Sequence, residues 1–314
     1  MKRPLIILTG PTAVGKTKLS IALAKAVNGE IISADSMQVY RGMDIGTAKI
    51  RPEEMQGIPH HLIDILPPEE DFNVVLFAKL AKQAMEQCYA QGKIPILVGG
   101  TGFYIQAVLY DIDFTENDDD KSYRESLERL AAEQGAEILH EKLRQVDPKA
   151  AEEIHPNNVK RVIRALEFYE KSGQKISEHN EEQKQKESPY NFAYFVLNDE
   201  RAVLYDRINQ RVDQMVEDGL EAEVQKLLSA GVSASSVSMQ GLGYKELVAY
   251  LNGECSLEEA IYILKRDTRH FAKRQLTWFK REEEVIWLDR PAFEQSEEKI
   301  LAEMLRIIDE KEMR

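Results

Sequence analysis

The sequence Gly10-Pro11-Thr12-Ala13-Val14-Gly15-Lys16-Thr17 follows the apolar run at residues 5–8 and precedes an amphipathic segment that begins near Lys18. The pattern G-x-x-x-x-G-K-[ST] between a strand and a helix is typical of a phosphate-binding loop. Its glycines let backbone N–H groups converge on phosphate oxygens, and the dipole of the following helix favours the same anion. Lys16 adds a positive charge, and Thr17 offers a hydroxyl ligand for Mg²⁺. We therefore predict a diphosphate-binding loop; the alternative is a glycine-rich turn that matches by chance.

The apolar segments around this loop predict an α/β fold, with a parallel, P-loop NTPase-like sheet flanked by helices and an inserted all-helical domain. Buried strands are expected at residues 5–8, 30–33, 94–98, 192–197 and 285–288. Residues 122–177 show only helical spacing. They follow a polar stretch that contains three consecutive aspartates at 118–120. We interpret these aspartates as a solvated domain boundary rather than as a cation site. We expect a catalytic core at 1–112 and 191–314, with basic C-terminal helices, and a helical domain at 113–190. The polar segment at 177–188 is predicted to be a linker or a mobile arm.

The whole chain of 314 residues has a formal net charge of −13. Because affinity for nucleic acids depends on Lys and Arg, this charge confines any such contact to local basic patches. The two cysteines, Cys88 and Cys255, are expected to be free thiols in a reducing compartment. The N-terminal apolar run is too short for a signal sequence, and no run of about 18 apolar residues occurs. We expect a cytoplasmic, monomeric protein that does not enter membranes.

Two strand ends near the phosphate loop carry candidate functional residues. Asp35 follows the strand at 30–33, and ligands of parallel α/β sheets bind at the carboxyl ends of the strands. Asp35 is therefore a candidate base, or alternatively a cap of the next turn. The strand at 94–98 ends in Gly99-Gly100-Thr101-Gly102, where ATP-hydrolysing P-loop proteins commonly have an Asp for Mg²⁺. Thr101 is a candidate contact for a phosphate or a base, and its alternative role is to cap a tight turn.

Two further segments bear on function, the histidine pair at 60–61 and the stretch at 42–57. Adjacent side chains diverge, so His60 and His61 are expected to pack or to form hydrogen bonds rather than to bind a metal ion. Residues 42–57 show no sustained periodicity and are predicted to form a long loop, and a loop of this length beside a phosphate site is usually functional.

Basic residues occur in the helical domain at helical spacing. The helix expected at 157–171 contains Lys160, Arg161, Arg164 and Lys171, of which Lys160, Arg164 and Lys171 share one face. Arg124 lies at the start of the first helix of the same domain. A solvated charged face is the alternative interpretation for both sets.

The strongest signal for nucleic-acid binding lies in a helix predicted at 257–279. Between residues 265 and 281 there are seven Lys or Arg and one acidic residue, which gives a local charge of 7 − 1 = +6. Lys273 and Arg274 recur at helical spacing with other basic residues, and Trp278 and Phe279 follow them. Basic side chains interleaved with aromatic rings indicate contact with a nucleic-acid backbone and bases.

Taken together, the motifs resemble those of the bacterial tRNA dimethylallyltransferase family, in order and over nearly the whole chain. They are the phosphate loop, Asp35-Ser36-Met37-Gln38-Val39-Tyr40, Met43-Asp44-Ile45-Gly46-Thr47-Ala48-Lys49, Pro59-His60-His61-Leu62-Ile63-Asp64, Gly99-Gly100-Thr101-Gly102, Arg164-Ala165-Leu166-Glu167, Gly243-Tyr244-Lys245-Glu246 and Arg274-Gln275-Leu276-Thr277-Trp278-Phe279. The resemblance implies transfer of the dimethylallyl group from dimethylallyl diphosphate to N6 of the adenosine just 3′ of the tRNA anticodon. Eukaryotic relatives add a zinc finger, for which this chain lacks the cysteines, so no structural metal is implied.

Carried over to this chain, the resemblance also assigns roles to residues. It implies that residues 10–17 hold the diphosphate with Mg²⁺ on Thr17, that Asp35 is the general base, and that Lys16 and Thr101 take part in catalysis. Either Arg211 or Arg207 would reach the diphosphate. The tRNA anticodon stem-loop would contact Asp35, Ser36, Met37, Gln38, Thr101, Arg124, Lys160, Arg161, Arg164, Gly243, Tyr244, Lys245, Lys273 and Arg274. The competing interpretation is a small-molecule kinase that binds ATP in the same loop and uses Asp35 to deprotonate a hydroxyl group, but it leaves the +6 helix unexplained.

Overall fold

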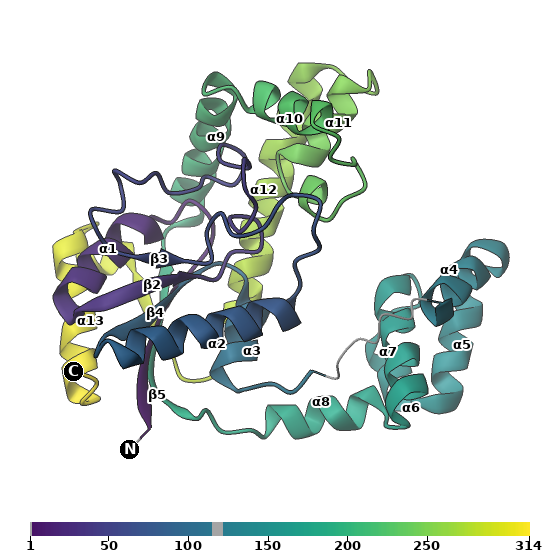
Figure 1. Ribbon diagram of the computed structural model, residues 1–314, viewed down its shortest axis with the longest axis horizontal. Helices are drawn as coiled ribbons and strands as arrows, with labels where there is room; N and C mark the ends of the chain where they lie inside the picture. The colour runs from purple at the N-terminus through teal and green to yellow at the C-terminus, as the bar shows by residue number, and fades with distance from the viewer. Residues whose placement is uncertain (1, 115–121) are drawn as a thin grey trace. The chain divides into compact units, whose positions relative to one another are not determined.

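The structure is a computed structural model that describes residues 2–114 and 122–314, so the triple aspartate at 118–120 lies outside the described residues. The chain divides into two compact units (Figure 1). Met1–Leu109 and Pro189–Arg314 form the first, and Tyr110–Ser188 form the second. The boundaries expected from the sequence, after residues 112 and 190, fall within three residues of these. Each unit is described by itself.

The first unit is built on a sheet of six parallel strands in the order β3-β2-β4-β1-β5-β6. The strands are β1 (Arg3–Thr9), β2 (Gly29–Ser33), β3 (His60–His61), β4 (Ile94–Gly99), β5 (Tyr190–Asn198) and β6 (Val285–Asp289). The five strands expected from the apolar runs are confirmed, and only the two-residue strand β3 was not predicted. Central strands are buried on both faces, which explains why β1 reads as a continuous apolar run rather than as an alternating one.

Helices cover both faces of the sheet. Helices α1 (Lys16–Val27) and α13 (Glu297–Glu310) share one apolar cluster with Ile6 and Leu8 of β1. Helices α2 (Val74–Ala90) and α3 (Gly102–Leu109) pack on the other face, where α2 contacts β2 and β4 (Figure 1). Residues 42–57, all of them described, form turns and loop without helix or strand, as predicted. The α/β, P-loop-like fold is thus confirmed.

The segment between β5 and β6 is mainly helical. It contains α9 (Arg201–Glu217), α10 (Leu220–Ser229), the short helix η1 (Ser238–Gln240), α11 (Tyr244–Leu251) and α12 (Leu257–Phe279). The predicted helix at 257–279 is confirmed to the residue. It begins where the side chain of Ser256 accepts a hydrogen bond from the backbone N–H of Glu259 at 3.1 Å, and Glu258 and Glu259 complement the dipole of its first turn. After β6, the short helix η2 (Arg290–Phe293) leads into α13.

The described residues of the second unit form five helices: α4 (Ser122–Gln134), α5 (Ala136–Val146), α6 (Pro148–Glu153), α7 (Val159–Ser172) and α8 (Ile176–Lys184). Their apolar faces form one cluster around Leu139, Leu143 and Val162. The linker or arm predicted at 177–188 is wrong, because α8 occupies most of that segment. Buried Asp147 fixes the start of α8, since its carboxylate accepts hydrogen bonds from the N–H of Ser177 at 2.9 Å and from its hydroxyl at 2.7 Å. No helix of the residues described in either unit is long and apolar enough to cross a membrane.

Candidate active site

The phosphate loop connects the end of β1 to the start of α1, at the carboxyl edge of the sheet (Figure 1). Gly10 has φ 144° and Gly15 has φ 96°, values that favour glycine. A side chain at Gly10 would also place a Cβ 2.2 Å from the carbonyl oxygen of Leu197, so the loop packs directly on the end of β5. Lys16 Nζ donates hydrogen bonds to the carbonyl oxygens of Gly10 and Pro11, each at 2.9 Å. The Lys16 ammonium therefore lies over the loop, where it would contact the oxygens of a bound phosphate.

Two buried side chains that the sequence reasoning did not single out hold this loop in place. Arg290 of η2 donates from Nε to the carbonyl oxygen of Val14 at 2.9 Å and lies against Gly15. Gln275 of α12 accepts the N–H of Thr12 at 2.8 Å and donates to the carbonyl oxygen of Gly100 at 3.0 Å. Both are about 95% buried. The motif around Gln275 was visible in the sequence, but nothing in the sequence showed that its amide faces the phosphate loop.

Asp35 follows β2 and faces the same edge. Its Oδ1 accepts the N–H groups of Met37 at 2.8 Å and Gln38 at 3.3 Å, so the capping role is present. Among the residues that the structure describes, Oδ2 has no hydrogen bond. Burial raises the pKa of Asp35, against the effect of these two hydrogen bonds and of the nearby Lys16 ammonium. Cap and base are therefore compatible, because one oxygen fixes the carboxylate and leaves the other available.

The end of β4 lies directly beside Asp35. The N–H of Ala34 donates to the carbonyl oxygen of Val98 at 2.8 Å, and the N–H of Thr101 donates to that of Ala34 at 3.3 Å. A Cβ at Gly99 would lie 2.3 Å from the Ala34 carbonyl oxygen, so only glycine permits this approach. Thr101, at the start of α3, also accepts the N–H of Tyr104 at 2.9 Å through its carbonyl oxygen. The structure therefore brings Thr101 next to Asp35, on the adjacent strand end.

Two cations face the phosphate loop. Burial, and then the proximity of Arg211 in α9, lower the pKa of Lys16 to about 7, while Asp35 acts in the opposite direction. Burial of its guanidinium also lowers the pKa of Arg211. Arg207, one turn earlier, is instead held by buried Asp199, to which it donates at 2.8 Å. Of the two arginines, Arg211 is therefore the one that lies close enough to Lys16 to affect its pKa.

The hydroxyl that could hold a metal ion is at the start of α1. Thr17 is exposed and lies in the first turn of the helix, whose backbone N–H groups have no earlier carbonyl partner. Hard cations such as Mg²⁺ take oxygen ligands, and a diphosphate held by the loop would bring further oxygens to this point. The residues present therefore fit a Mg²⁺ ion that is shared with a diphosphate.

The predicted tRNA residues after Asp35 lie at the same edge and are partly exposed. Gln38 is anchored by Ser33, whose hydroxyl donates to its Oε1 at 3.2 Å, and donates in turn to the carbonyl oxygen of Thr47 at 3.3 Å. Ser36 and Met37 are half-buried, and the methyl group of Met37 lies against Gly241. This segment is thus tied to the long loop at 42–57.

The motif at residues 243–246 is mostly buried. Tyr244 is completely buried, and its hydroxyl donates to Glu223 of α10 at 2.6 Å. The same carboxylate accepts the backbone N–H groups of Asp44, Ile45 and Gly46 at 2.8–3.1 Å. Gly243 is also buried and has φ 93° before the first turn of α11. These positions argue against direct tRNA contact for Gly243 and Tyr244, whose role is to anchor the long loop, whereas Lys245 is exposed.

The exposed face of α12 agrees with the basic pattern. Lys273 and Arg274 are exposed, and neither has a carboxylate partner among the described residues. They line a hollow of about 520 Å³ together with His270, Thr277, Trp278 and Arg281. By contrast, Arg269 is engaged, because it donates to Asn209 of α9 at 2.6 Å.

In the second unit the predicted contacts differ in exposure. Lys160 and Arg161 are exposed on α7, and Arg164 is half-buried beside Arg161 in a small surface hollow. Arg124 donates two hydrogen bonds, at 3.0 and 2.9 Å, to the buried carboxylate of Glu167. It therefore ties α4 to α7, and its side chain keeps an exposed fraction of 39% for any further contact.

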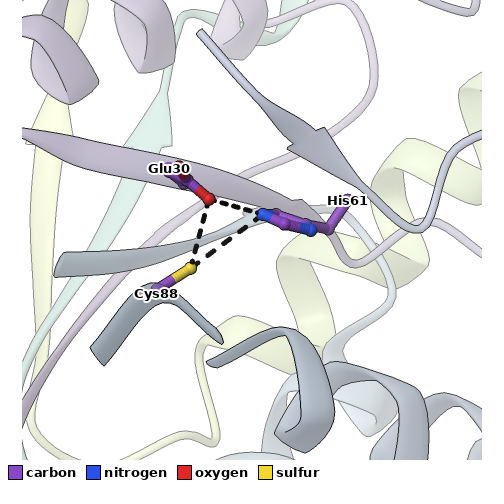
Figure 2. A group of neighbouring side chains, drawn as sticks. All are labelled: Glu30, His61 and Cys88. Atoms are coloured by element: carbon purple, nitrogen blue, oxygen red, sulfur yellow. Dashed lines mark hydrogen bonds and ion pairs between the residues drawn. The ribbon is translucent and has the colours of Figure 1, made fainter. Parts of the chain in front are cut away.

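A second cluster lies at the amino edge of β2. Glu30, His61 and Cys88 place a carboxylate, a ring nitrogen and a thiol within 4.8 Å of one another (Figure 2), so a cysteine does lie near His61 in space. The Glu30 carboxylate is already paired, with His61 Nε2 at 2.7 Å and with Lys93. Burial and the neighbouring Glu30 raise the pKa of Cys88 to about 12, which keeps the thiol protonated. The hydrogen-bonding role expected for the histidines is confirmed.

Known protein families and individual relatives match this chain. The sequence model of the family described as IPP transferase matches residues 38–282. The chain belongs to this family. A model described as isopentenyl transferase also matches residues 3–69. The resemblance to tRNA dimethylallyltransferases indicated by the motifs is therefore confirmed.

Individual relatives match over nearly the whole chain. The tRNA dimethylallyltransferase of Lachnoclostridium phytofermentans is 64% identical over 311 residues, which cover 99% of both chains. The crystal structure of a tRNA isopentenylpyrophosphate transferase from Bacillus halodurans has a TM-score of 0.74 and 48% identity, covering 99% of this chain and 98% of that one. A eukaryotic dimethylallyltransferase that acts on tRNA has a TM-score of 0.80 and 33% identity, covering 91% and 74%.

Proposed function

We propose that the protein transfers the dimethylallyl group from dimethylallyl diphosphate to N6 of the adenosine just 3′ of the anticodon of tRNA. The observation that carries this proposal is the pairing, at one sheet edge, of a cationic phosphate loop with a carboxylate on the neighbouring strand end. Lys16 lies over the loop, and both Arg211 and Asp35 lie close enough to Lys16 to affect its pKa. The glycines that end β4 leave this edge without the carboxylate that ATP hydrolysis commonly uses there.

The cationic groups would stabilise the leaving diphosphate. The bond from the allylic C1 to oxygen breaks readily once the charge that develops on the diphosphate is neutralised, and loop N–H groups, Lys16 and Arg211 are placed to do this. Mg²⁺ held by Thr17 and the diphosphate would supply further positive charge at the same group. Lys16 Nζ donates to two carbonyl oxygens of the loop, which holds the ammonium over the phosphate-binding backbone.

Asp35 would act on the acceptor. The adenine amine is a weak nucleophile because its lone pair is delocalised into the ring, so a base must take its proton as the C–N bond forms. The raised pKa of Asp35 makes its carboxylate a better proton acceptor. Thr101 follows the adjacent strand end and donates its N–H to the carbonyl oxygen of Ala34, next to Asp35, where it would help to orient the acceptor.

A base in a stacked anticodon loop must leave the stack before it can enter such a site. Contacts to the RNA backbone would stabilise that state, and Lys273 and Arg274 on the exposed face of α12, which have no carboxylate partner in the described part of the chain, would make them. In the second unit Lys160, Arg161 and Arg164 would add to these contacts. We further propose that the protein acts as a monomer in the cytoplasm, which suits its two free thiols.

The test is to incubate unmodified total tRNA with the protein, Mg²⁺ and dimethylallyl diphosphate, and to analyse the nucleosides by mass spectrometry. We expect N6-dimethylallyladenosine, and its loss when a chelator removes Mg²⁺. A parallel measurement of thermal unfolding should show protection by dimethylallyl diphosphate that grows with the logarithm of its concentration. Protection by ATP alone, without modified nucleoside, would favour the kinase.

A further inference from the structure

The side chains of Glu30, His61 and Cys88 meet at the opposite end of β2 from Asp35 and come from three separate elements, β2, β3 and α2 (Figure 2). Glu30 Oε2 lies 2.7 Å from His61 Nε2 and 3.6 Å from Cys88 Sγ. The distance from Sγ to Nε2 is 4.0 Å. A carboxylate oxygen, a ring nitrogen and a sulfur therefore face one another in pairs, away from the candidate active site.

The size of this triangle fits a tetrahedral zinc ion. Bonds from zinc of about 2.3 Å to sulfur and about 2.0–2.2 Å to nitrogen and oxygen place the ligand atoms about 3.4–3.6 Å apart. The two distances from Sγ, 3.6 and 4.0 Å, are already close to these values. The contact between Glu30 and His61 would open from 2.7 Å to about 3.4 Å. The side chain of His61 is 23% exposed, which gives the ring room to shift and a water molecule access to the fourth ligand position.

The surroundings direct the ligand atoms toward one another. Lys93 pairs with Oε1 of Glu30, so Oε2 is the oxygen that faces His61 and Cys88. The Glu30 side chain is 3% exposed and Cys88 is completely buried, so packing fixes both groups. His61 Nδ1 has no hydrogen bond within the described part of the chain, so it can carry the ring proton when Nε2 binds a metal ion.

The thiol of Cys88 must lose its proton to become a ligand. Burial and the nearby Glu30 carboxylate raise the pKa of this thiol. A divalent cation between the two groups reverses both effects, because it neutralises the carboxylate and gives the buried sulfur a positive neighbour. The Zn–S bond forms as the S–H bond breaks, and the proton leaves to solvent. His61 changes to the tautomer with its proton on Nδ1.

We propose that Glu30, His61 and Cys88 bind one Zn²⁺ ion, with water as the fourth ligand, and that this ion holds β3 and α2 to β2. Strand β3 lies at the edge of the sheet and pairs with β2 through only two residues, so a metal bond at His61 would add a link where the backbone pairing is short. A thiolate and an imidazole favour zinc over Mg²⁺, which takes oxygen ligands. This site is therefore distinct from the Mg²⁺ ion proposed at Thr17, and it does not depend on the proposed function.

The test measures the binding of Co²⁺ and then Zn²⁺ to the full chain after treatment with a chelator and dialysis. Co²⁺ is the probe because a cobalt–thiolate bond gives a charge-transfer band in the near ultraviolet, which a site of oxygen ligands alone does not give. We expect one Co²⁺ per chain with this band, and its loss when one equivalent of Zn²⁺ is added. Competition with a chromophoric chelator gives the Zn²⁺ affinity. In Cys88→Ser the band should disappear and Zn²⁺ should bind at least about tenfold more weakly, since even loss of a partner behind a metal ligand costs that much.

The chain offers a matched control for each variant. His61→Gln should weaken Zn²⁺ binding as Cys88→Ser does, and it tests the site if the serine variant folds poorly. His60→Gln changes the neighbouring ring, which is bound to the Ile58 carbonyl oxygen, and should keep the wild-type affinity. Cys255→Ser changes the other free cysteine and should keep the cobalt–thiolate band. A wild-type protein without this band, or a band that persists in both Cys88→Ser and His61→Gln, would overturn the inference and leave the proposed function as it stands.

Discussion

The two loops at the carboxyl edge of the sheet, the phosphate loop at residues 10–15 and the long loop at residues 42–57, use their polar groups in opposite ways. In the phosphate loop Lys16 binds only carbonyl oxygens of its own loop, without a carboxylate partner among the described residues. In the long loop Lys49 is 96% buried and is paired with Asp44 and Asp64, while Glu223 takes three backbone N–H groups. We infer that Lys49 and Glu223, whose charges are satisfied by partners, stabilise the fold of the long loop. Lys16 is held in place by carbonyl oxygens and keeps its charge available for a ligand.

Asp35 gives the most severe test of this distinction. Asp35→Asn keeps an oxygen that can accept the N–H groups of Met37 and Gln38, so the turn should persist. The amide cannot accept a proton, and the single-turnover rate with saturating tRNA and dimethylallyl diphosphate should fall by about 10²- to 10⁴-fold. Binding of both substrates should change little. A rate within about threefold of wild type would make Asp35 a cap or a positioning group instead.

The charge of Lys16 should make the affinity for diphosphate depend on pH. Its pKa of about 7 means that the ammonium is present below pH 7 and is lost as the pH rises above it. Binding requires the charged form, so the wild-type affinity for inorganic diphosphate should weaken by up to about tenfold for each pH unit above 7. In Lys16→Met, diphosphate should bind more weakly at every pH, and the additional loss of affinity above pH 7 should be absent. Titration of the diphosphate itself contributes equally to both proteins, so it cancels in the comparison. Equal pH slopes would mean that Lys16 does not titrate in this range.

Glu223 tests the opposite case, in the long loop. Glu223→Gln replaces a carboxylate that accepts from the loop and from Tyr244, and leaves N–H groups facing an NH₂ group. The free energy of unfolding in urea should fall by about 1–3 kcal/mol, while diphosphate affinity stays within about twofold. Glu221→Gln, two residues earlier on α10 with no hydrogen-bond partner among the described residues, is the matched control and should change stability by less than about 0.5 kcal/mol. A loss of diphosphate binding without a loss of stability would reverse the assignment of the two loops.

The sequence predicted what depends on local periodicity and on short motifs. The five main strands, the helix at 257–279 and the phosphate loop follow from apolar spacing and from glycines that allow backbone approach. Contacts between distant segments were not predictable, because they depend on how elements pack. Examples are the hydrogen bond from the Thr12 N–H to Gln275, the hydrogen bond from Arg290 to the Val14 carbonyl oxygen, and the proximity of Cys88 to His61.

The same reason explains two positions whose structure could not be derived from the local sequence. Tyr244 lies in a motif and was assigned to tRNA, but its burial against Gly46 comes from the fold of the long loop. The polar segment at 177–188 lacks an apolar face of its own, and α8 is held there by Asp147, thirty residues earlier than Ser177. In both cases a tertiary contact decided the structure of a locally ambiguous segment.

The smallest effect is expected on α12, where the same distinction separates neighbouring arginines. Lys273 and Arg274 are exposed and have no carboxylate partner among the described residues, whereas Arg269 is bound to Asn209. Changing Lys273 and Arg274 together to Ala should remove two backbone contacts and flatten the slope of log K against log salt for tRNA binding by about 1 to 2 units, with an unchanged rate at saturation. Arg269→Ala should leave that slope as it is and lower stability instead. If the double variant kept the wild-type slope, the basic face of α12 would be solvated rather than in contact with RNA, since counterion release follows directly from the number of phosphates neutralised.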